Sequence, residues 1–250
     1  MKLSVALAVY NEADFLPRCL DSVNGLSNEI VVVDGGSTDQ TVVIAKTFKA
    51  RIFSTNNPKM FHVNKQKAID ACRGDWILQL DADEEVTLEL AKEIKKILIQ
   101  KNNINGYWIP RRNFFLGRFL TKGGQYPDYT IRLYRRGKGY LPCKDVHEQA
   151  VVTGLIGYLK NPLLHYADSL FTRYLFRFNR YTSLLALDFQ KKKIGKNLLN
   201  AILYFFIKPL WWFMKTYIRH KGFVDGWQGF VFSFFSSLRF AVAFIKYLWL

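Results

Sequence analysis

The 250-residue sequence predicts an α/β protein, in which helices cover both faces of a mostly parallel sheet, followed by a helical C-terminal region. Two observations predict the sheet. Short and nearly continuous apolar runs alternate with segments of helical spacing over the first 100 residues, which is typical of buried parallel strands joined by helices. Each of these runs also stops at polar or acidic residues. A third observation, the aromatic and basic composition after residue 198, predicts the C-terminal region.

The expected elements follow from local patterns of apolar residues. The strands are predicted where apolar and β-branched residues run together, at Ser4–Tyr10, Glu29–Val33, Arg51–Ser54 and Trp76–Leu80. The helices are predicted where apolar residues recur every three or four positions, at Phe15–Val23, Thr38–Phe48, 63–73 and Leu88–Gln100. Short strands are also expected at Trp108–Pro110, Thr130–Tyr134 and Gly139–Leu141, with a flexible loop at Gly117–Tyr126.

Polar side chains follow three of the predicted strands. Asn11 and Glu12 follow the first strand, Asp34 ends the second, and Asp81 and Asp83 follow the strand at Trp76–Leu80. Ligands of open parallel sheets bind beyond the carboxyl ends of the strands. The shared position of these residues is therefore the first indication of a functional site.

The Asp81-Ala82-Asp83 segment carries two carboxylates that project to the same side of an extended chain, about 7 Å apart. One can bind a divalent cation while the other reaches a ribose or a water. Mg²⁺ or Mn²⁺ suits such hard oxygen ligands and would neutralise the diphosphate of a nucleotide. The alternative is a solvated turn that leads into the helix beginning near Thr87.

The Asp34–Asp39 segment has two interpretations as well. Its glycines can form a turn, and Ser37 or Thr38 can cap the helix that follows. A role in nucleotide binding is the functional alternative. Found together in this order, the two acidic segments favour the functional interpretation of both.

Three motifs together resemble glycosyltransferase family 2, whose members have the GT-A fold. They are VALAVYNEADFLPRCLDSV, IVVVDGGSTDQT and ACRGDWILQLDADEEV, within residues 3–100. Over residues 105–180, YWIPRRNFFLGRFL, GGQYPDYTIRLYRR and VHE resemble the branch that builds the inner core of lipopolysaccharide. The predicted fold is therefore a GT-A, Rossmann-like α/β fold.

The resemblance implies roles for the strand-end residues. Asn11 and Glu12 would lie near the base and ribose of a nucleotide, and Asp34 would contact the base or ribose. Many relatives have a second acidic residue directly after this aspartate, where the present chain has Gly35.

The resemblance also implies the residues of a metal site and a catalytic base. Asp81 would lie by the ribose and diphosphate, and Asp83 would be the main ligand of Mg²⁺ or Mn²⁺. In the favoured alignment Glu148 is the general base that deprotonates the acceptor hydroxyl, and His165 completes the metal ligands.

A second alignment stays open, in which Asp128 is the base and His147 is the metal ligand. The two histidines also have an ordinary interpretation as hydrogen-bonded structural residues. Arg132, Arg135 and Arg136 are candidates for binding a diphosphate or an anionic acceptor, and a solvated strand edge is the equal alternative.

Charge is concentrated in the C-terminal part. The chain has 36 Lys and Arg against 20 Asp and Glu, and residues 151–250 hold 14 of the basic and 3 of the acidic residues. This excess indicates an anionic partner. No RNA-binding motif or recognition helix is present, so nucleic acid is not expected. Three scattered cysteines, with no CxxC pair, indicate a reducing compartment.

Residues 198–250 contain 17 of the 40 aromatic residues, in two apolar runs interrupted by charges. Lys208-Pro209 interrupts the first run, and Arg239 and Lys246 interrupt the second. Membrane-spanning helices are thus disfavoured. Helices that lie in the membrane interface fit better, because tryptophans suit the headgroup level and basic residues attract anionic lipid. The alternative is a helical bundle that packs on the catalytic domain.

The expected protein is thus a metal-dependent, inverting glycosyltransferase at the cytosolic face of the plasma membrane, bound peripherally or monotopically. Residues 1–165 would form the catalytic domain, with a nucleotide-sugar half (1–100) and an acceptor half (101–165), and residues 166–250 a helical membrane-associating tail. The resemblance implies a UDP-sugar donor such as UDP-glucose, and a lipid-linked acceptor such as lipopolysaccharide core. The alternatives are a polyprenyl-phosphate sugar transferase and a non-catalytic basic protein that binds membrane or nucleic acid.

Overall fold

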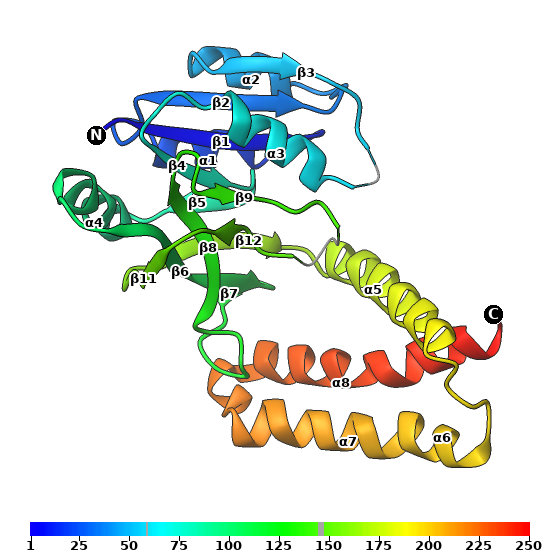
Figure 1. The fold of residues 1–250 in the computed structure, drawn as a ribbon. Coiled ribbons are helices and arrows are strands. Elements are labelled where there is room, and N and C mark those ends of the chain that lie inside the picture. The colour runs from blue at the N-terminus through cyan, green and yellow to red at the C-terminus, as the bar shows by residue number, and fades with distance from the viewer. Residues whose placement is uncertain (59, 145–147) are drawn as a thin grey trace. The chain divides into compact units, whose positions relative to one another are not determined.

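The computed structural model describes residues 1–58, 60–144 and 148–250, and the chain forms two compact units. The first unit contains Met1–Arg111 and Tyr129–His165, and the second contains Arg112–Asp128 and Tyr166–Leu250. Residues 112–128, expected from the sequence within the acceptor half, thus group with the C-terminal helices. Figure 1 shows the course of the chain through both units.

The first half of the sheet is parallel. Its strands are β3, β2, β1 and β4 in that order, with bounds Arg51–Ser54, Glu29–Asp34, Leu3–Val9 and Trp76–Leu80. In the register of β1 and β2, Val9 pairs with Asp34. The segments after these two strands therefore begin at the same edge of the sheet, as the polar strand ends predict.

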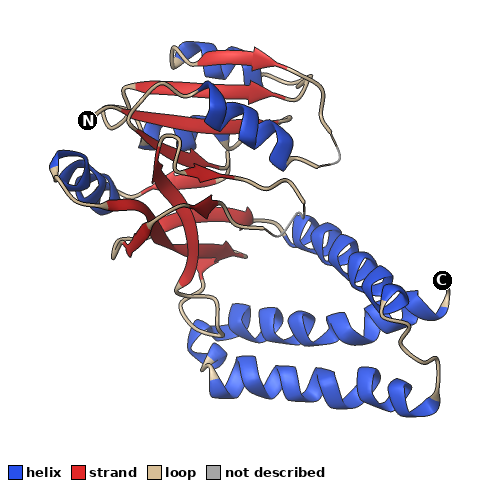
Figure 2. Ribbon diagram, viewed as in Figure 1, coloured by secondary structure: helices blue, strands red, loops and turns tan. Residues whose placement is uncertain are grey.

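Helices cover both faces of this parallel half, as predicted. On one face lie α1, α2 and α4, with bounds Leu16–Ser22, Thr41–Thr47 and Leu88–Ile99. On the other face lies α3, His62–Ala71, whose Ala68 and Ile69 are buried against Ala6 and Val31. Successive residues of β1 pack into the hydrophobic cores on opposite faces of the sheet. Because the strand is buried on both faces, its sequence is a nearly continuous apolar run. Figure 2 shows the helices and strands of this unit.

The second half of the sheet is mixed rather than parallel. The strand order continues from β4 to β8, β6, β12 and β5, with bounds Asp128–Arg135, Ile104–Phe115, Leu163–Asp168 and Glu84–Val86. β8 runs antiparallel to β4, and β12 runs antiparallel to β5. A mostly parallel sheet is therefore an accurate description of residues 1–80 only. β6 is also longer than the predicted Trp108–Pro110, because it continues through the arginines at positions 111 and 112.

The remaining strands are short. β7 and β11 pair with β6, and β9 pairs with β10 in a separate ladder, with bounds Arg118–Phe119, Leu155–Tyr158, Gly139–Tyr140 and Val151–Val152. β7 lies within the segment that the sequence predicts as a loop. Its two residues pair with Phe114 and Phe115 of β6, and form a tight hairpin.

The helical unit is built on three long helical segments. α5 spans Phe171–Lys191 and α8 spans Gly226–Leu248, and a short 3₁₀ turn, η3, Gly222–Asp225, precedes α8. Between α5 and η3, one helical segment alternates between α- and π-helix. Its four parts are α6, η1, α7 and η2, with bounds Leu198–Ile202, Leu203–Ile207, Lys208–Phe213 and Met214–Arg219. This segment and α8 form an antiparallel hairpin (Figure 1).

Pro209 interrupts the helical pattern without ending the helix. It lies in the first turn of α7, directly after the π-helical η1. A proline has no N–H to donate, and the first turn of a helical segment does not need one. The helix therefore continues past the proline, although Lys208-Pro209 interrupts the apolar run of the sequence.

Many apolar side chains of the helical unit stay exposed. Gly222–Leu248 is long and apolar enough to cross a membrane by length and composition, and it is the one such segment in the described residues. One third of its apolar window is buried within the protein. Exposed apolar residues occur on both arms of the hairpin, among them Leu210, Trp211, Met214, Trp227, Phe230 and Phe234. The exposed surface of both arms, in the part of the chain that the structure describes, is thus largely apolar, unlike that of a soluble bundle.

Candidate functional site

The segments after β1 and β2 are joined by hydrogen bonds. Asn11 has a left-handed backbone, with φ of 53°, and its side-chain oxygen accepts from the backbone N–H of Thr38 at 2.8 Å. Its own N–H donates to Ser37 Oγ at 2.9 Å. The N–H of Glu12 donates to Thr41 Oγ1 at 2.8 Å. The polar residues at the two strand ends thus form one structured edge.

Asp34 is buried at the end of β2 and holds the turn that follows it. Its carboxylate accepts from the backbone N–H groups of Gly36 at 3.1 Å and Ser37 at 3.2 Å. Gly36 has a φ of 87°, which suits glycine. At Gly35, a Cβ atom would lie 3.3 Å from the Cβ of Asn57, so a larger residue would require Asn57 to shift.

Asp81 lies between two cations. Its Oδ1 pairs with Nζ of Lys65 from α3, and its Oδ2 accepts from Nη2 of Arg132 at 2.6 Å. Arg132 also donates to Glu84 at 2.8 Å and to Gln79. Glu84, Gln79 and Arg132 are all buried. The carboxylate of Asp81 is therefore fixed by a charged network beneath the edge of the sheet.

The electrostatics of this network keep Asp81 ionised. Burial alone would raise the pKa of Asp81, but the positive charges of Arg132 and Lys65 outweigh it and hold the pKa well below its usual value. The same carboxylate, together with that of Glu84, raises the pKa of Arg132 against the opposing effect of burial. The network thus holds an ionised carboxylate, paired with two cations, at the end of β4.

Asp83 and His165 lie together at the beginning of β5. His165 is on β12, which pairs with β5 so that His165 is opposite Glu84. The Nε2 atom of His165 lies 3.6 Å from Oδ2 of Asp83. Burial lowers the pKa of His165 below its usual value although the charge of Asp83 opposes this, so the imidazole is neutral near pH 7.

These two side chains fit a divalent metal in part. A carboxylate and a neutral imidazole are suitable ligands, and Mg²⁺ is commonly held by one or two protein ligands plus substrate phosphates and waters. Within the residues that the structure describes, no three His, Cys, Asp or Glu side chains converge on a metal position. Of the expected set, the structure brings Asp83 and His165 together, while Asp81 is held by Lys65 and Arg132.

Glu148 lies in the first unit beside α3. Its Oε1 is 3.3 Å from Nδ1 of His62 and accepts from the backbone N–H of Cys143, and its Oε2 accepts from the N–H of Lys144 at 3.0 Å. His62 is one turn before Lys65 on α3. The same helix therefore contacts the expected base and the acidic end of β4.

Asp128 begins β8 and belongs to the second unit. Its Oδ2 accepts from the side-chain amide of Asn113 at 3.2 Å. His147, its partner in the second alignment, lies outside the described residues.

The arginines after Asp128 have structural contacts. Arg132 lies in the buried network and is neither a solvated strand edge nor open to a diphosphate. The Cζ atom of Arg135 lies 4.8 Å from the centroid of the Trp76 ring, and its guanidinium donates to the backbone carbonyls of Asn102 and Ile104. Arg136 is exposed. Arg132 and Arg135, candidates for binding an anion, thus have protein partners in the structure.

Three residues of this edge were not predicted from the sequence. Lys65 and Glu84 contact Asp81, and Asp39 accepts from the backbone N–H groups of Ala13 at 3.1 Å and Thr41 at 2.9 Å. Asp39 follows the SerThr pair of the second motif, and this position could have identified it. Lys65 lies in a helix with no distinctive motif, and only the fold brings it to Asp81.

Comparisons with known proteins agree on one family. The profile of glycosyl transferase family 2 matches residues 4–151. The lipopolysaccharide core biosynthesis glycosyltransferase LpsC of Rhizobium meliloti is 28% identical over 96% of this chain and 92% of its own length. An uncharacterised glycosyltransferase of Rickettsia typhi is 30% identical over 96% of this chain and 86% of its own. Among solved structures, S. aureus TarS aligns with a TM-score of 0.50 at 17% identity, over 99% of this chain and 53% of its own, which bears on the fold alone.

Proposed function

Because the chain belongs to glycosyltransferase family 2, we propose that it is a metal-dependent, inverting enzyme that transfers a sugar from a nucleotide to a lipid-linked acceptor. The observation that carries this proposal is the pairing of Asp83 with a neutral His165, next to the fixed carboxylate of Asp81. All three belong to the first unit, and Asp81 directly follows the carboxyl end of β4, where α/β sheets bind their ligands.

The donor and acceptor are proposed from the relatives. The name of LpsC assigns that protein to lipopolysaccharide core biosynthesis, and this favours lipopolysaccharide core as the acceptor here. UDP-glucose is the first donor to test, as the family resemblance implies. A polyprenyl phosphate is the alternative acceptor, and the experiment below includes it.

In the proposed reaction, the residues of this chain hold the donor and remove a proton. Asp83 and His165 would hold Mg²⁺ or Mn²⁺, which when bound neutralises the diphosphate and improves it as a leaving group. The turns held by Asn11 and Asp34 would bind the base and ribose. The acceptor oxygen loses its proton to a carboxylate and forms a bond to C1 of the sugar, while the bond from C1 to the diphosphate breaks. The nucleoside diphosphate is released.

Glu148 is the proposed base, and Asp128 is the alternative. The contact of Glu148 with His62 supports a place near the donor, because Lys65 of the same helix pairs with Asp81. Its hydrogen bonds to the N–H groups of Cys143 and Lys144 also suit a purely structural role. Activity and stability of a variant separate the two roles, since a structural residue affects both.

A position at the cytosolic face of the inner membrane is also proposed. Residues 191–250 carry ten Lys and Arg residues and one acidic residue, beside exposed apolar side chains on both arms of the helical hairpin. Such a combination binds anionic lipid surfaces. The proposed donor, a nucleotide sugar, is a cytosolic metabolite, and this favours the cytosolic face.

The test is release of nucleoside diphosphate from a panel of nucleotide sugars, with Mn²⁺ or EDTA. Lipopolysaccharide core and polyprenyl phosphate serve as separate acceptors. We expect one donor to be used only with metal and core acceptor. Asp83→Asn and Glu148→Gln should each lower kcat at least about a hundredfold. Asp21→Asn, an exposed residue of α1, is the matched control and should retain activity.

Other outcomes redirect the proposal. Turnover in EDTA equal to that in Mn²⁺ contradicts the metal assignment. Retained activity in Glu148→Gln with loss in Asp128→Asn moves the base to Asp128. Turnover with polyprenyl phosphate alone changes the acceptor, and no turnover with any donor and acceptor favours a non-catalytic binding protein.

A further inference from the structure

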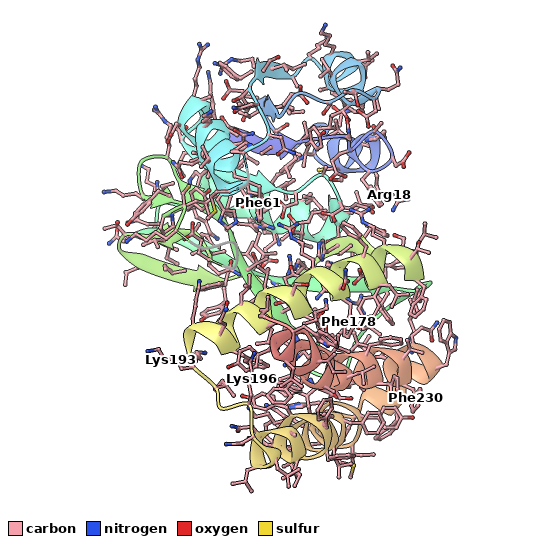
Figure 3. The ribbon with its side chains drawn as sticks, turned by 90° about the vertical axis from the view of Figure 1, so that its right-hand side faces the viewer. Arg18, Phe61, Phe178, Lys193, Lys196 and Phe230 are labelled. Carbon is pink, nitrogen blue, oxygen red and sulfur yellow. The ribbon has the colours of Figure 1, made fainter. Side chains whose placement is uncertain are left out.

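His62, the first residue of α3, is a buried histidine that contacts the proposed base. Its side chain is 6% exposed, and its Nδ1 atom lies 3.3 Å from Oε1 of Glu148, whose side chain is 12% exposed. Phe61 directly precedes α3 (Figure 3), and its ring meets that of His62 edge to face, with centroids 4.4 Å apart. The imidazole is thus in contact with both an aromatic ring and the Glu148 carboxylate.

The charges around His62 decide which partner donates in this contact. Burial lowers the pKa of His62 below its usual value, and the charge of Lys65 adds to this, while the carboxylates of Glu148 and Asp81 oppose it. The imidazole is therefore neutral near pH 7 and carries one proton. An ionised carboxylate can only accept a hydrogen bond, so this proton lies on Nδ1, and His62 donates to Glu148.

Two backbone N–H groups also donate to the carboxylate of Glu148. That of Cys143 donates to Oε1, and that of Lys144 donates to Oε2 at 3.0 Å. Both belong to the same short segment as Glu148, so they fold this segment on itself without fixing its place in the first unit. The contact with His62 comes from 86 residues away in the sequence and joins the carboxylate to α3.

We propose that His62 is a positioning residue, whose Nδ1–H group holds the Glu148 carboxylate at a fixed place relative to the donor site. α3 is suited to this because its Lys65, one turn after His62, pairs with Asp81 at the end of β4. The proton of the acceptor hydroxyl goes to Glu148, and His62 keeps its own proton. Displacing a catalytic group by about 1 Å can cost about a hundredfold in rate. This inference rests on the proposed function and on Glu148 as its base.

The test measures kcat and KM of three His62 variants in the transferase assay, with Mn²⁺ and the donor that the wild type uses. His62→Leu should lower kcat at least about tenfold and leave the KM of the donor within about twofold, because other residues bind the donor. His62→Asn should keep kcat within about threefold, since its amide nitrogen lies two bonds from Cβ, as Nδ1 does. His62→Gln places its amide nitrogen one bond further out and should resemble His62→Leu.

Gln66→Leu is the matched control on the same helix. The side-chain oxygen of Gln66 accepts from the backbone N–H of Leu141 at 2.7 Å, and so joins α3 to the chain seven residues before Glu148. Its loss should lower the thermal stability but keep kcat within about twofold of the wild type. Equal losses of kcat in Gln66→Leu and His62→Leu would show a general loosening of α3 from this part of the chain, and would overturn the positioning role.

Further comparisons separate this inference from the proposed function. Equal kcat in His62→Asn and His62→Gln would overturn the donated hydrogen bond, and this pair keeps the test valid where His62→Leu unfolds. In a Glu148→Gln background, His62→Leu should change the residual rate by less than about twofold, and a further tenfold loss would overturn action through Glu148.

Two outcomes show which of the two proposals fails. Loss of activity in Glu148→Gln beside full activity in His62→Leu would overturn the positioning role alone. No turnover by the wild type, or full activity in Glu148→Gln, would overturn the proposed function or its base, and the role of His62 with it.

Discussion

At the scale of single residues, Asp81 illustrates how the fold assigns roles that residue type does not. The Asp81 carboxylate contacts Lys65 from a helix and Arg132 from a strand, so its oxygens are held by two opposite charges. Asp83, two positions later, instead faces His165. One acidic segment thus supplies a fixed charge and a candidate metal ligand.

The network of Asp81 predicts a specific loss of stability in acid. Its pKa is lowered in the folded protein, so the stabilising effect is complete above the unfolded value of about 3.9 and is lost as the pH falls through the folded value. We expect the free energy of unfolding to decrease between about pH 5 and pH 2. In Asp81→Asn this decrease should be smaller, as measured by urea unfolding at a series of pH values.

Asp21→Asn provides the control for this measurement, because Asp21 is exposed on α1. Its pH dependence should follow that of the wild type. Identical slopes for Asp81→Asn and the wild type in acid would show that Asp81 is not stabilised by Lys65 and Arg132.

At the scale of elements, the turn between η3 and α8 brings the backbone of Gly229 close to that of Gly222. A Cβ atom added to Gly229 would lie 1.9 Å from the carbonyl oxygen of Gly222, a distance that no relaxation of a side chain can relieve. Asp225, between these glycines, accepts from Thr121 and Lys122 and so joins the segment at 112–128 to the start of α8. The two contacts fix how α8 begins.

Gly229→Ala should therefore destabilise the helical unit by at least about 2 kcal/mol, because the backbone must move to admit one methyl group. Thermal unfolding followed by far-ultraviolet circular dichroism measures this. Ser233→Ala is the matched control one turn later, since the buried hydroxyl of Ser233 has no hydrogen-bond partner in the described residues. It should be neutral within about 0.5 kcal/mol or stabilising. An equal stability of Gly229→Ala and the wild type would contradict the close approach.

The sequence predicts some elements well for a physical reason. β4 has the expected bounds because all five of its residues are buried, which makes the strand a nearly continuous apolar run. The bounds of β3, a partly exposed strand at the end of the sheet, also agree with the expectation. The antiparallel strands of the second half carry polar residues at intervals, so β6 was predicted as three residues where the structure has twelve. The continuation of the helix past Pro209 was also not predicted, because the π-helical turn leaves no pattern in the sequence.

The sequence predicted the neighbours of some residues of the candidate site and not those of others. Asp83 and His165 were expected together, and they lie 3.6 Å apart in the structure. Arg132 was expected at an anion site because arginines commonly bind phosphate, but burial beside Glu84 and Asp81 gives it protein partners instead. Side chains that meet across distant segments, such as Lys65 and Asp81, need the fold to be identified.

At the scale of the whole molecule, the distribution of charge separates two tasks. Residues 1–150 carry 22 basic and 17 acidic residues, and the acidic ones at the strand ends form the candidate donor site. Residues 151–250 carry 14 basic and 3 acidic residues, beside exposed aromatic side chains. In the proposed reaction, the acidic strand ends would bind a soluble nucleotide sugar, and the basic and aromatic region would bind the membrane that holds the acceptor. The proposed reaction accounts for both compositions.

The most direct test of this account is calorimetric binding of UDP in the presence of Mn²⁺ or EDTA. We predict that the wild-type protein binds UDP at least about tenfold more tightly with Mn²⁺, because the metal links the diphosphate to Asp83 and His165. Asp83→Asn should lose this difference, while Asp21→Asn should keep it. Binding of UDP that is equally tight in EDTA, or a metal effect that survives in Asp83→Asn, would contradict the central claim.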